Sequence, residues 1–128
     1  MFDKKTKSYT DLLGKTNRIV EGTTIHGDIT SPADFRLDGV LIGNFTSNGK
    51  LVIGPAGSVK GDIICNTVDI EGKFEGKMKI EDTLKVKEFA SIIGEVEIGK
   101  LSVEPGATFH ASCVMLSKTN KNTTSVNE

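Results

Sequence analysis

The side chains of this 128-residue chain that could carry out chemistry are few and widely spaced. The chain has two cysteines, Cys65 and Cys113, and two histidines, His26 and His110. A zinc site needs three or four ligands, and its cysteines usually come in closely spaced pairs. The two cysteines form neither a metal-ligand pair nor a disulfide framework. We therefore interpret both as small buried hydrophobic residues.

Charge and hydropathy exclude several classes of protein. Sixteen Lys and Arg residues balance seventeen Asp and Glu residues, so the chain lacks the positive field of a nucleic-acid binder. The longest apolar runs, such as 40–42 and 113–116, are far shorter than the about 20 residues of a membrane-spanning helix. The first seven residues lack the apolar region of a secretory signal. These features predict a cytoplasmic protein with no nucleic-acid partner.

A repeat of about 17 residues fills the middle of the chain. Short apolar, polar, apolar stretches start at positions 35, 68, 84 and 101. The apolar stretch 51–53 joins the series, and one further step back reaches Ile19. A second column follows the same rhythm and consists of Gly27, Gly43, Gly61, Gly76, Gly94 and Ala111. Two residues before it lie Ile25, Leu41, Val59, Phe74, Ile92 and Phe109. Two residues after it lie Ile29, Phe45, Ile63, Met78, Val96 and Cys113.

The period-two alternation within each unit is typical of β-strands, because successive side chains point to opposite faces. A unit of 16 to 18 residues is too short for a helix pair or a propeller blade, but it fits one turn of a three-sided solenoid. We predict an all-β fold, a single-stranded parallel β-helix of about six triangular coils, over residues 17–116. The glycines are expected at corners, and extra residues lengthen one turn at 54–58, 88–91 and 104–108.

The remaining polar residues can be compared with the catalytic and metal-binding residues of enzymes that have β-helical folds. Hexapeptide-type acyltransferases need a catalytic histidine and a long loop, but no coil here has a long insertion. His26 and His110 are expected to point outward near opposite ends, too far apart to share a zinc ion. Asp38, Asp69 and Glu71 are scattered along strands with no evident calcium cage. We predict no catalytic, cofactor-binding or metal-binding residues; an acyltransferase and a monomeric β-helical interaction module are the alternatives.

Both ends of such a rod are expected to be unfinished. At roughly 4.8 Å per strand layer, six coils would span about 29 Å. The terminal coils would expose unpaired backbone groups and one layer of core side chains, which solenoids normally cover with a cap. The sequence shows no convincing cap. We predict a polymerisation interface at both ends, formed by Leu101, Val103, Phe109 and Cys113 at one and by Ile19, Ile25 and Ile29 at the other.

The six coils, the short polar tails and the start Met-Phe-Asp-Lys-Lys-Thr-Lys resemble the bactofilin family of bacterial polymer-forming cytoskeletal proteins. The resemblance covers about residues 1–7 and 17–116, and the coils carry most of it. It implies a right-handed β-helix that assembles end to end, without nucleotide, into non-polar filaments. It also implies association with the inner face of the cytoplasmic membrane and recruitment of cell-wall or morphogenesis proteins, such as those of peptidoglycan synthesis or hydrolysis. The degenerate first coil and Ala111 depart from the pattern.

The two ends of the sequence are expected to act as tails. Residues 1–16 are predicted to be a flexible tail with a membrane-targeting motif, and residues 117–128 a disordered tail. The motif consists of Met1, Phe2, Lys4, Lys5 and Lys7. Each lysine near an anionic leaflet is worth about 1 kcal/mol, so one chain would bind weakly. A filament displays many tails, and avidity could raise the affinity by about 10² or more.

Overall fold

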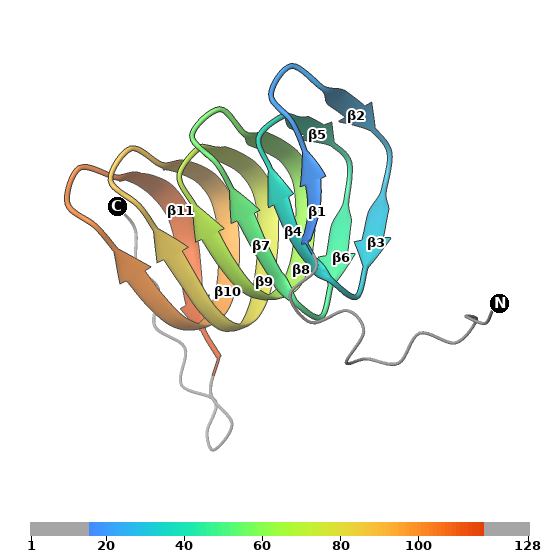
Figure 1. The fold of residues 1–128 in the computed structure, drawn as a ribbon. Coiled ribbons are helices and arrows are strands. Elements are labelled where there is room, and N and C mark those ends of the chain that lie inside the picture. The colour runs from blue at the N-terminus through green and yellow to red at the C-terminus, as the bar shows by residue number, and fades with distance from the viewer. Residues whose placement is uncertain (1–15, 117–128) are drawn as a thin grey trace, which may run out of the picture.

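A computed structural model describes residues 16–116, in which eleven strands and no helix form one parallel sheet wound into a solenoid (Figure 1). The first seven strands are β1 (Thr16–Ile19), β2 (Thr24–His26), β3 (Ile29–Ser31), β4 (Asp34–Leu37), β5 (Val40–Ile42), β6 (Phe45–Ser47) and β7 (Lys50–Ile53). Four long strands follow, β8 (Ser58–Ile70), β9 (Lys73–Val86), β10 (Ser91–Val103) and β11 (Thr108–Met115). The long strands bend around corners and so contribute to more than one side of the solenoid.

The solenoid has three faces and about six coils (Figure 1). Face 1 consists of β1, β4, β7 and residues 67–70, 83–86 and 100–103. Face 2 consists of β2, β5 and residues 58–60, 73–75, 91–93 and 108–110. Face 3 consists of β3, β6 and residues 63–65, 77–80, 95–98 and 112–115. This parallel β-helix, consistent with a right-handed one, confirms the predicted fold class.

The strand register confirms the two columns that flank the corner residues. Phe74 pairs with Ile92 and Ile92 with Phe109, while Val96 pairs with Cys113. The predicted position of Ile19 was wrong, because Asn17 pairs with Phe35 and Ile19 pairs with Leu37. The sequence pattern missed the start of the first strand because its first inward residue, Asn17, is polar. Such a residue is tolerated there because the first coil has a neighbouring coil on one side only within the described part of the chain.

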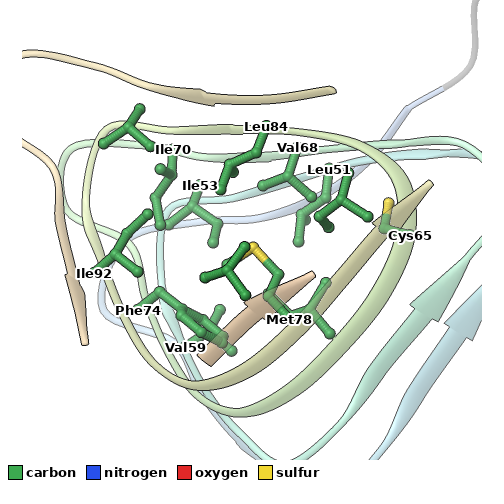
Figure 2. Packing of buried hydrophobic residues seen from close by; sticks show 14 of the residues in the cluster. Leu51, Ile53, Val59, Cys65, Val68, Ile70, Phe74, Met78, Leu84 and Ile92 are labelled. Atoms are coloured by element: carbon green, nitrogen blue, oxygen red, sulfur yellow. The ribbon is translucent and has the colours of Figure 1, made fainter. Parts of the chain in front are cut away.

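The interior of the solenoid is a continuous apolar core. Figure 2 shows aliphatic side chains from successive coils, among them Ile53, Ile70 and Ile92, converging inside the triangle. Near the start of the rod the rings of Phe35 and Phe45 meet edge to face, with centroids 5.2 Å apart. The predicted burial of both cysteines is confirmed. The described residues contain no helix with the length and apolar composition needed to cross a bilayer.

The predicted corner glycines lie where the chain passes from face 2 to face 3. Their φ angles are all positive, for example +148° at Gly61 and +136° at Gly27. A Cβ on Gly61 would also strike the carbonyl oxygen of Gly43 in the preceding coil. Glycine is therefore required both by the backbone conformation and by the close stacking of successive corners.

The predicted long turns are found between face 1 and face 2. Each is closed by a backbone hydrogen bond, from Gly57 N to Gly54 O, Ala90 N to Lys87 O and Ala107 N to Glu104 O. The first coil has a similar turn, which the sequence did not reveal, in which Thr23 N donates to Val20 O at 3.2 Å.

Candidate assembly surfaces at the ends of the rod

The polar side chains considered for catalysis are dispersed over the rod. His26 lies in the first coil and His110 in the last, both exposed on face 2. Asp38 accepts hydrogen bonds from Arg36 Nε at 2.9 Å and Nη2 at 3.1 Å, and this contact raises the pKa of Arg36. Asp69 lies 3.4 Å from Lys50 Nζ. No group of three potential metal ligands comes together within residues 16–116.

The two thiols are poor candidates for chemistry. Burial raises the pKa of both Cys65 and Cys113, which favours the protonated form. Cys65 Sγ donates to the backbone carbonyl of Gly49 at 3.1 Å, and Cys113 Sγ contacts Met115 Sδ at 3.8 Å. A buried, protonated thiol is neither a nucleophile nor a metal ligand, so the ends of the rod remain the surfaces of interest.

The first coil leaves its inward isoleucines incompletely covered. Ile19, Ile25 and Ile29 are partly buried and pack against the core. Identical residues deeper in the same three columns are fully buried: Ile53, Ile92 and Ile63. Residue type and strand position are the same in each pair, so the difference in burial arises from the missing layer. This end therefore presents apolar area that one more coil would cover.

The last coil shows the same contrast most strongly on face 1. Val103 is 42% exposed and Leu101 is partly buried, whereas Val86 and Leu84, their counterparts in the preceding coil, are fully buried. Leu101 and Val103 thus lie together at an uncovered edge of the rod.

Phe109 and Cys113 do not share this exposure. Phe109 is 3% exposed, close to the 2% of Phe74 in the same column, and Cys113 is fully buried. Both side chains fill the last coil and offer little free area to another rod. Met115, which the sequence reasoning missed, is partly buried beside Cys113. Met115 pairs with Ile98 and therefore belongs to an inward column. The repeat in the sequence could have revealed this position.

The two ends also differ in polarity. At the first coil, the side-chain amide of Asn17 donates to Ser31 Oγ at 3.0 Å, and Ser31 Oγ accepts from Ala33 N. Asn17 shares its column with Leu101 in the last coil. One end is therefore a mixed polar and apolar surface, whereas the corresponding position at the other end is apolar.

Both ends carry strand edges without partners among the described residues. The strands β1, β2 and β3 pair only with the second coil, and β11 pairs only with β10. Unpaired N–H and C=O groups along such an edge can pair with a strand of another chain. Each end thus combines an open hydrogen-bonding edge with incompletely covered core side chains.

Some predicted features lie outside the part of the chain that the structure describes. These are the membrane-targeting residues Met1, Phe2, Lys4, Lys5 and Lys7, and the two predicted tails apart from Thr16, which is the first residue of β1.

Comparisons with known proteins address the family directly. A family model described as "Bactofilin: Polymer-forming cytoskeletal" matches residues 17–114. The chain is similar to the curated protein Bactofilin BacO of Myxococcus xanthus (strain DK1622), with 24% identity over 91 residues. This alignment covers 71% of this chain and 72% of the relative. No solved structure was found to match.

Proposed function

The chain belongs to the bactofilin family of polymer-forming cytoskeletal proteins, and from this premise we propose that its rods stack end to end into nucleotide-independent filaments. Bactofilins are structural proteins rather than enzymes. The observation that carries the proposal is the unequal burial of identical residues, such as Val103 and Val86, in terminal and interior coils. A stacked neighbour would supply the missing layer.

Stacking has two favourable components. The strand edges of two rods would continue the hydrogen-bonded ladder across the junction. The remaining apolar area of Ile19, Ile25, Ile29, Leu101 and Val103 would be removed from water, and complete burial of such a side chain is worth about 1.5–3 kcal/mol. The buried side chains of Phe109 and Cys113 would support the interface from within the last coil. Neither component needs a nucleotide.

The filaments are proposed to be non-polar, with like ends in contact. In a head-to-tail junction, Asn17 of one rod would stack on Leu101 of the next, because the two share a column. The Asn17 amide donates one hydrogen bond to Ser31, but burying its remaining donor and acceptor groups against an apolar side chain is unfavourable. Contacts between like ends instead place polar groups near polar groups and apolar groups near apolar groups.

The filament is further proposed to be a scaffold on the inner face of the cytoplasmic membrane. Support comes from the family and from the sequence of residues 1–7, in which Phe2 and three lysines could engage an anionic leaflet. Cell-wall or morphogenesis proteins, including enzymes of peptidoglycan synthesis or hydrolysis, are the proposed partners.

Electron microscopy of the purified chain without nucleotide tests the assembly. We expect filaments from the wild type. Val103→Arg places a charge on the exposed edge and should stop growth at pairs of rods joined through their first coils. Ser102→Arg, one residue away on the outer surface of face 1, is the matched control and should still form filaments. Because Phe109 is buried, Phe109→Arg would also disturb the last coil and is a less specific test.

The outcomes distinguish the parts of the proposal. Single rods from the wild type would contradict assembly altogether. Single rods rather than pairs from Val103→Arg would favour polar, head-to-tail filaments. Filaments of normal length from Val103→Arg would remove Val103 from the interface.

Vesicle pelleting tests membrane association. Filaments should sediment with anionic vesicles, and deletion of residues 1–7 should reduce the bound fraction strongly, because about 10² or more of the affinity would come from many tails acting together. Pelleting that is unchanged by the deletion would contradict the assigned role of this segment.

A further inference from the structure

The outer surface of face 2 carries a column of six side chains, one from each coil. In axial order they are His26, Ile42, Lys60, Glu75, Ile93 and His110, and each pairs in register with the next. All six are exposed and alternate along their strands with inward residues such as Leu41 and Ile92. Ile42 and Ile93 are large apolar side chains that are 39% and 47% exposed. Neither side chain packs in the core of the solenoid.

The order of this column reads nearly the same from either end. A histidine occupies each end, an isoleucine follows, and the two central residues, Lys60 and Glu75, have opposite charges. Lys60 Nζ and Glu75 Oε1 lie 3.9 Å apart within the chain. The midpoint of the column falls between these two residues, that is, between the third and fourth coils.

We propose that face 2 is a self-complementary surface through which two filaments of this protein pair side by side with their rods antiparallel. A two-fold axis lying between the faces and along the strand direction exchanges the two halves of the rod. It sets Ile42 of one copy against Ile93 of the second copy. It also sets Lys60 against Glu75 of the second copy, so that four charges alternate in sign around the axis. A contact of this kind uses the same patch on both copies.

The neighbouring outward column on face 2 is compatible with this arrangement. It consists of Thr24, Val40, Ser58, Lys73, Ser91 and Thr108. The same axis sets threonine against threonine, Val40 against Ser91 and Ser58 against Lys73. No like charges meet. A parallel pairing about an axis along the central column would instead set Lys60 against Lys60 and Glu75 against Glu75, which is unfavourable.

The other two faces match less well than face 2. On face 1 the corresponding outward column contains Arg36 in the second coil and Lys85 in the fifth, which would meet as like charges. On face 3, Ile64 in the third coil would meet Lys79 in the fourth. A second column of face 3 would set Asp62 against Lys77, so opposite charges meet there too. Among the described residues, only face 2 has one column that matches isoleucine with isoleucine and lysine with glutamate.

The size of the surface indicates when pairing would matter. Six layers at roughly 4.8 Å give a contact about 29 Å long and only two outward residues wide. This is well below the about 800 Å² per partner of a stable complex. A single pair of rods should therefore bind weakly, whereas the contact repeats along a filament and adds up. The inference in this form rests on the proposed end-to-end filament.

Charge reversal tests the register. High-speed sedimentation reports all filaments, and low-speed sedimentation with electron microscopy reports laterally paired ones. Lys60→Glu should leave the high-speed pellet unchanged and lower the low-speed pellet by about fivefold or more, since like charges then meet across the axis. The double variant Lys60→Glu/Glu75→Lys restores opposite charges across the axis and should restore pairing.

Lys79→Glu is a matched control, because Lys79 also stands between an isoleucine and a glutamate in its column, but on face 3. It should pair like the wild type. Wild-type filaments that stay single would overturn the inference and leave the proposed function intact. Equal loss with Lys79→Glu, or no rescue by the double variant, would also overturn it.

Thiol crosslinking tests the same contact within the filaments. Filaments assembled from a mixture of Ile42→Cys and Ile93→Cys variants should yield covalent dimers with a short bismaleimide, whereas filaments of either variant alone should not. The native thiols are buried, so the background should be low. Dimers from either variant alone would indicate a parallel pair, and the absence of dimers from the mixture would contradict the antiparallel contact.

Discussion

Ile25 and Ile92 occupy the same position of the repeat on face 2, yet Ile25 is only partly buried while Ile92 has no exposed surface. Their strands have the same alternation and the same inward direction. The difference in burial between these two positions therefore comes from the coils before and after them along the axis. Terminal coils contain core residues whose burial another rod could complete.

The second comparison is between the two ends. The first coil leaves an isoleucine partly covered on each of its three faces and includes the polar pair of Asn17 and Ser31. The last coil is uncovered mainly at Leu101 and Val103, because Phe109 is already buried. A repeat with one inward pattern thus gives two chemically different ends, which is the physical basis for preferring contacts between like ends.

The largest expected effect comes from truncating the two isoleucines. Ile92→Ala should lower the free energy of unfolding by about 3–4 kcal/mol, because it leaves a cavity in a closely packed coil. Ile25→Ala should cost about 1 kcal/mol, because solvent and neighbouring side chains can fill its half-covered site. Urea denaturation in the Val103→Arg background, at concentrations where that variant is a monomer, measures both. Equal losses would contradict the argument from the missing layer.

The corner glycines offer a second matched pair with a smaller effect. Gly61→Ala meets both a positive φ and the carbonyl oxygen of Gly43, and should cost about 2–3 kcal/mol. Gly27→Ala in the first coil has a similar φ but no atom within 4 Å of the added Cβ, and should cost about 1 kcal/mol. Thermal and urea unfolding measure the difference. A loss at Gly27 as large as that at Gly61 would show that the stacking of the corners adds nothing.

The cysteines give the smallest effect, in rates rather than stability. Since burial raises both pKa values, the thiolate fraction at pH 8 is lower than that of a free thiol, and labelling should be slow and keep rising with pH. Cys113 should react faster than Cys65, because a terminal coil opens more readily than an interior one. Filament formation should slow Cys113 alone. Mass spectrometry of alkylated peptides measures both rates, and equal protection of the two thiols by assembly would argue against stacking at the last coil.

Much of the architecture could be predicted because the repeat makes each local pattern visible several times. The columns through Phe74 and through Met78, the positive-φ corners and the lengthened turns all follow from period-two alternation and from glycine spacing. The position of the first strand could not be predicted in this way. Asn17 breaks the apolar pattern, and a terminal coil tolerates this because it has a neighbouring coil on one side only among the described residues.

The site residues were predictable only as members of terminal coils. Leu101, Val103 and the three isoleucines of the first coil could be placed at the ends by counting repeats, whereas the exposure of each could not. The sequence does not state that Phe109 is 3% exposed and Val103 42%, because both have the same apolar, inward pattern.

The sequence by itself determined which side chains point inward, because alternation along a strand is a local property of the backbone. It also determined the number of coils and the positions where glycine is needed. Only the tertiary structure decided which residues lie next to one another along the axis, because that depends on turn lengths and on the register shifts between Cys65 and Thr67 and between Ile98 and Lys100. The symmetric column on face 2 and the difference between the two ends are therefore properties of the tertiary structure. Stacking of the coils brings together residues that are about 17 positions apart in the chain.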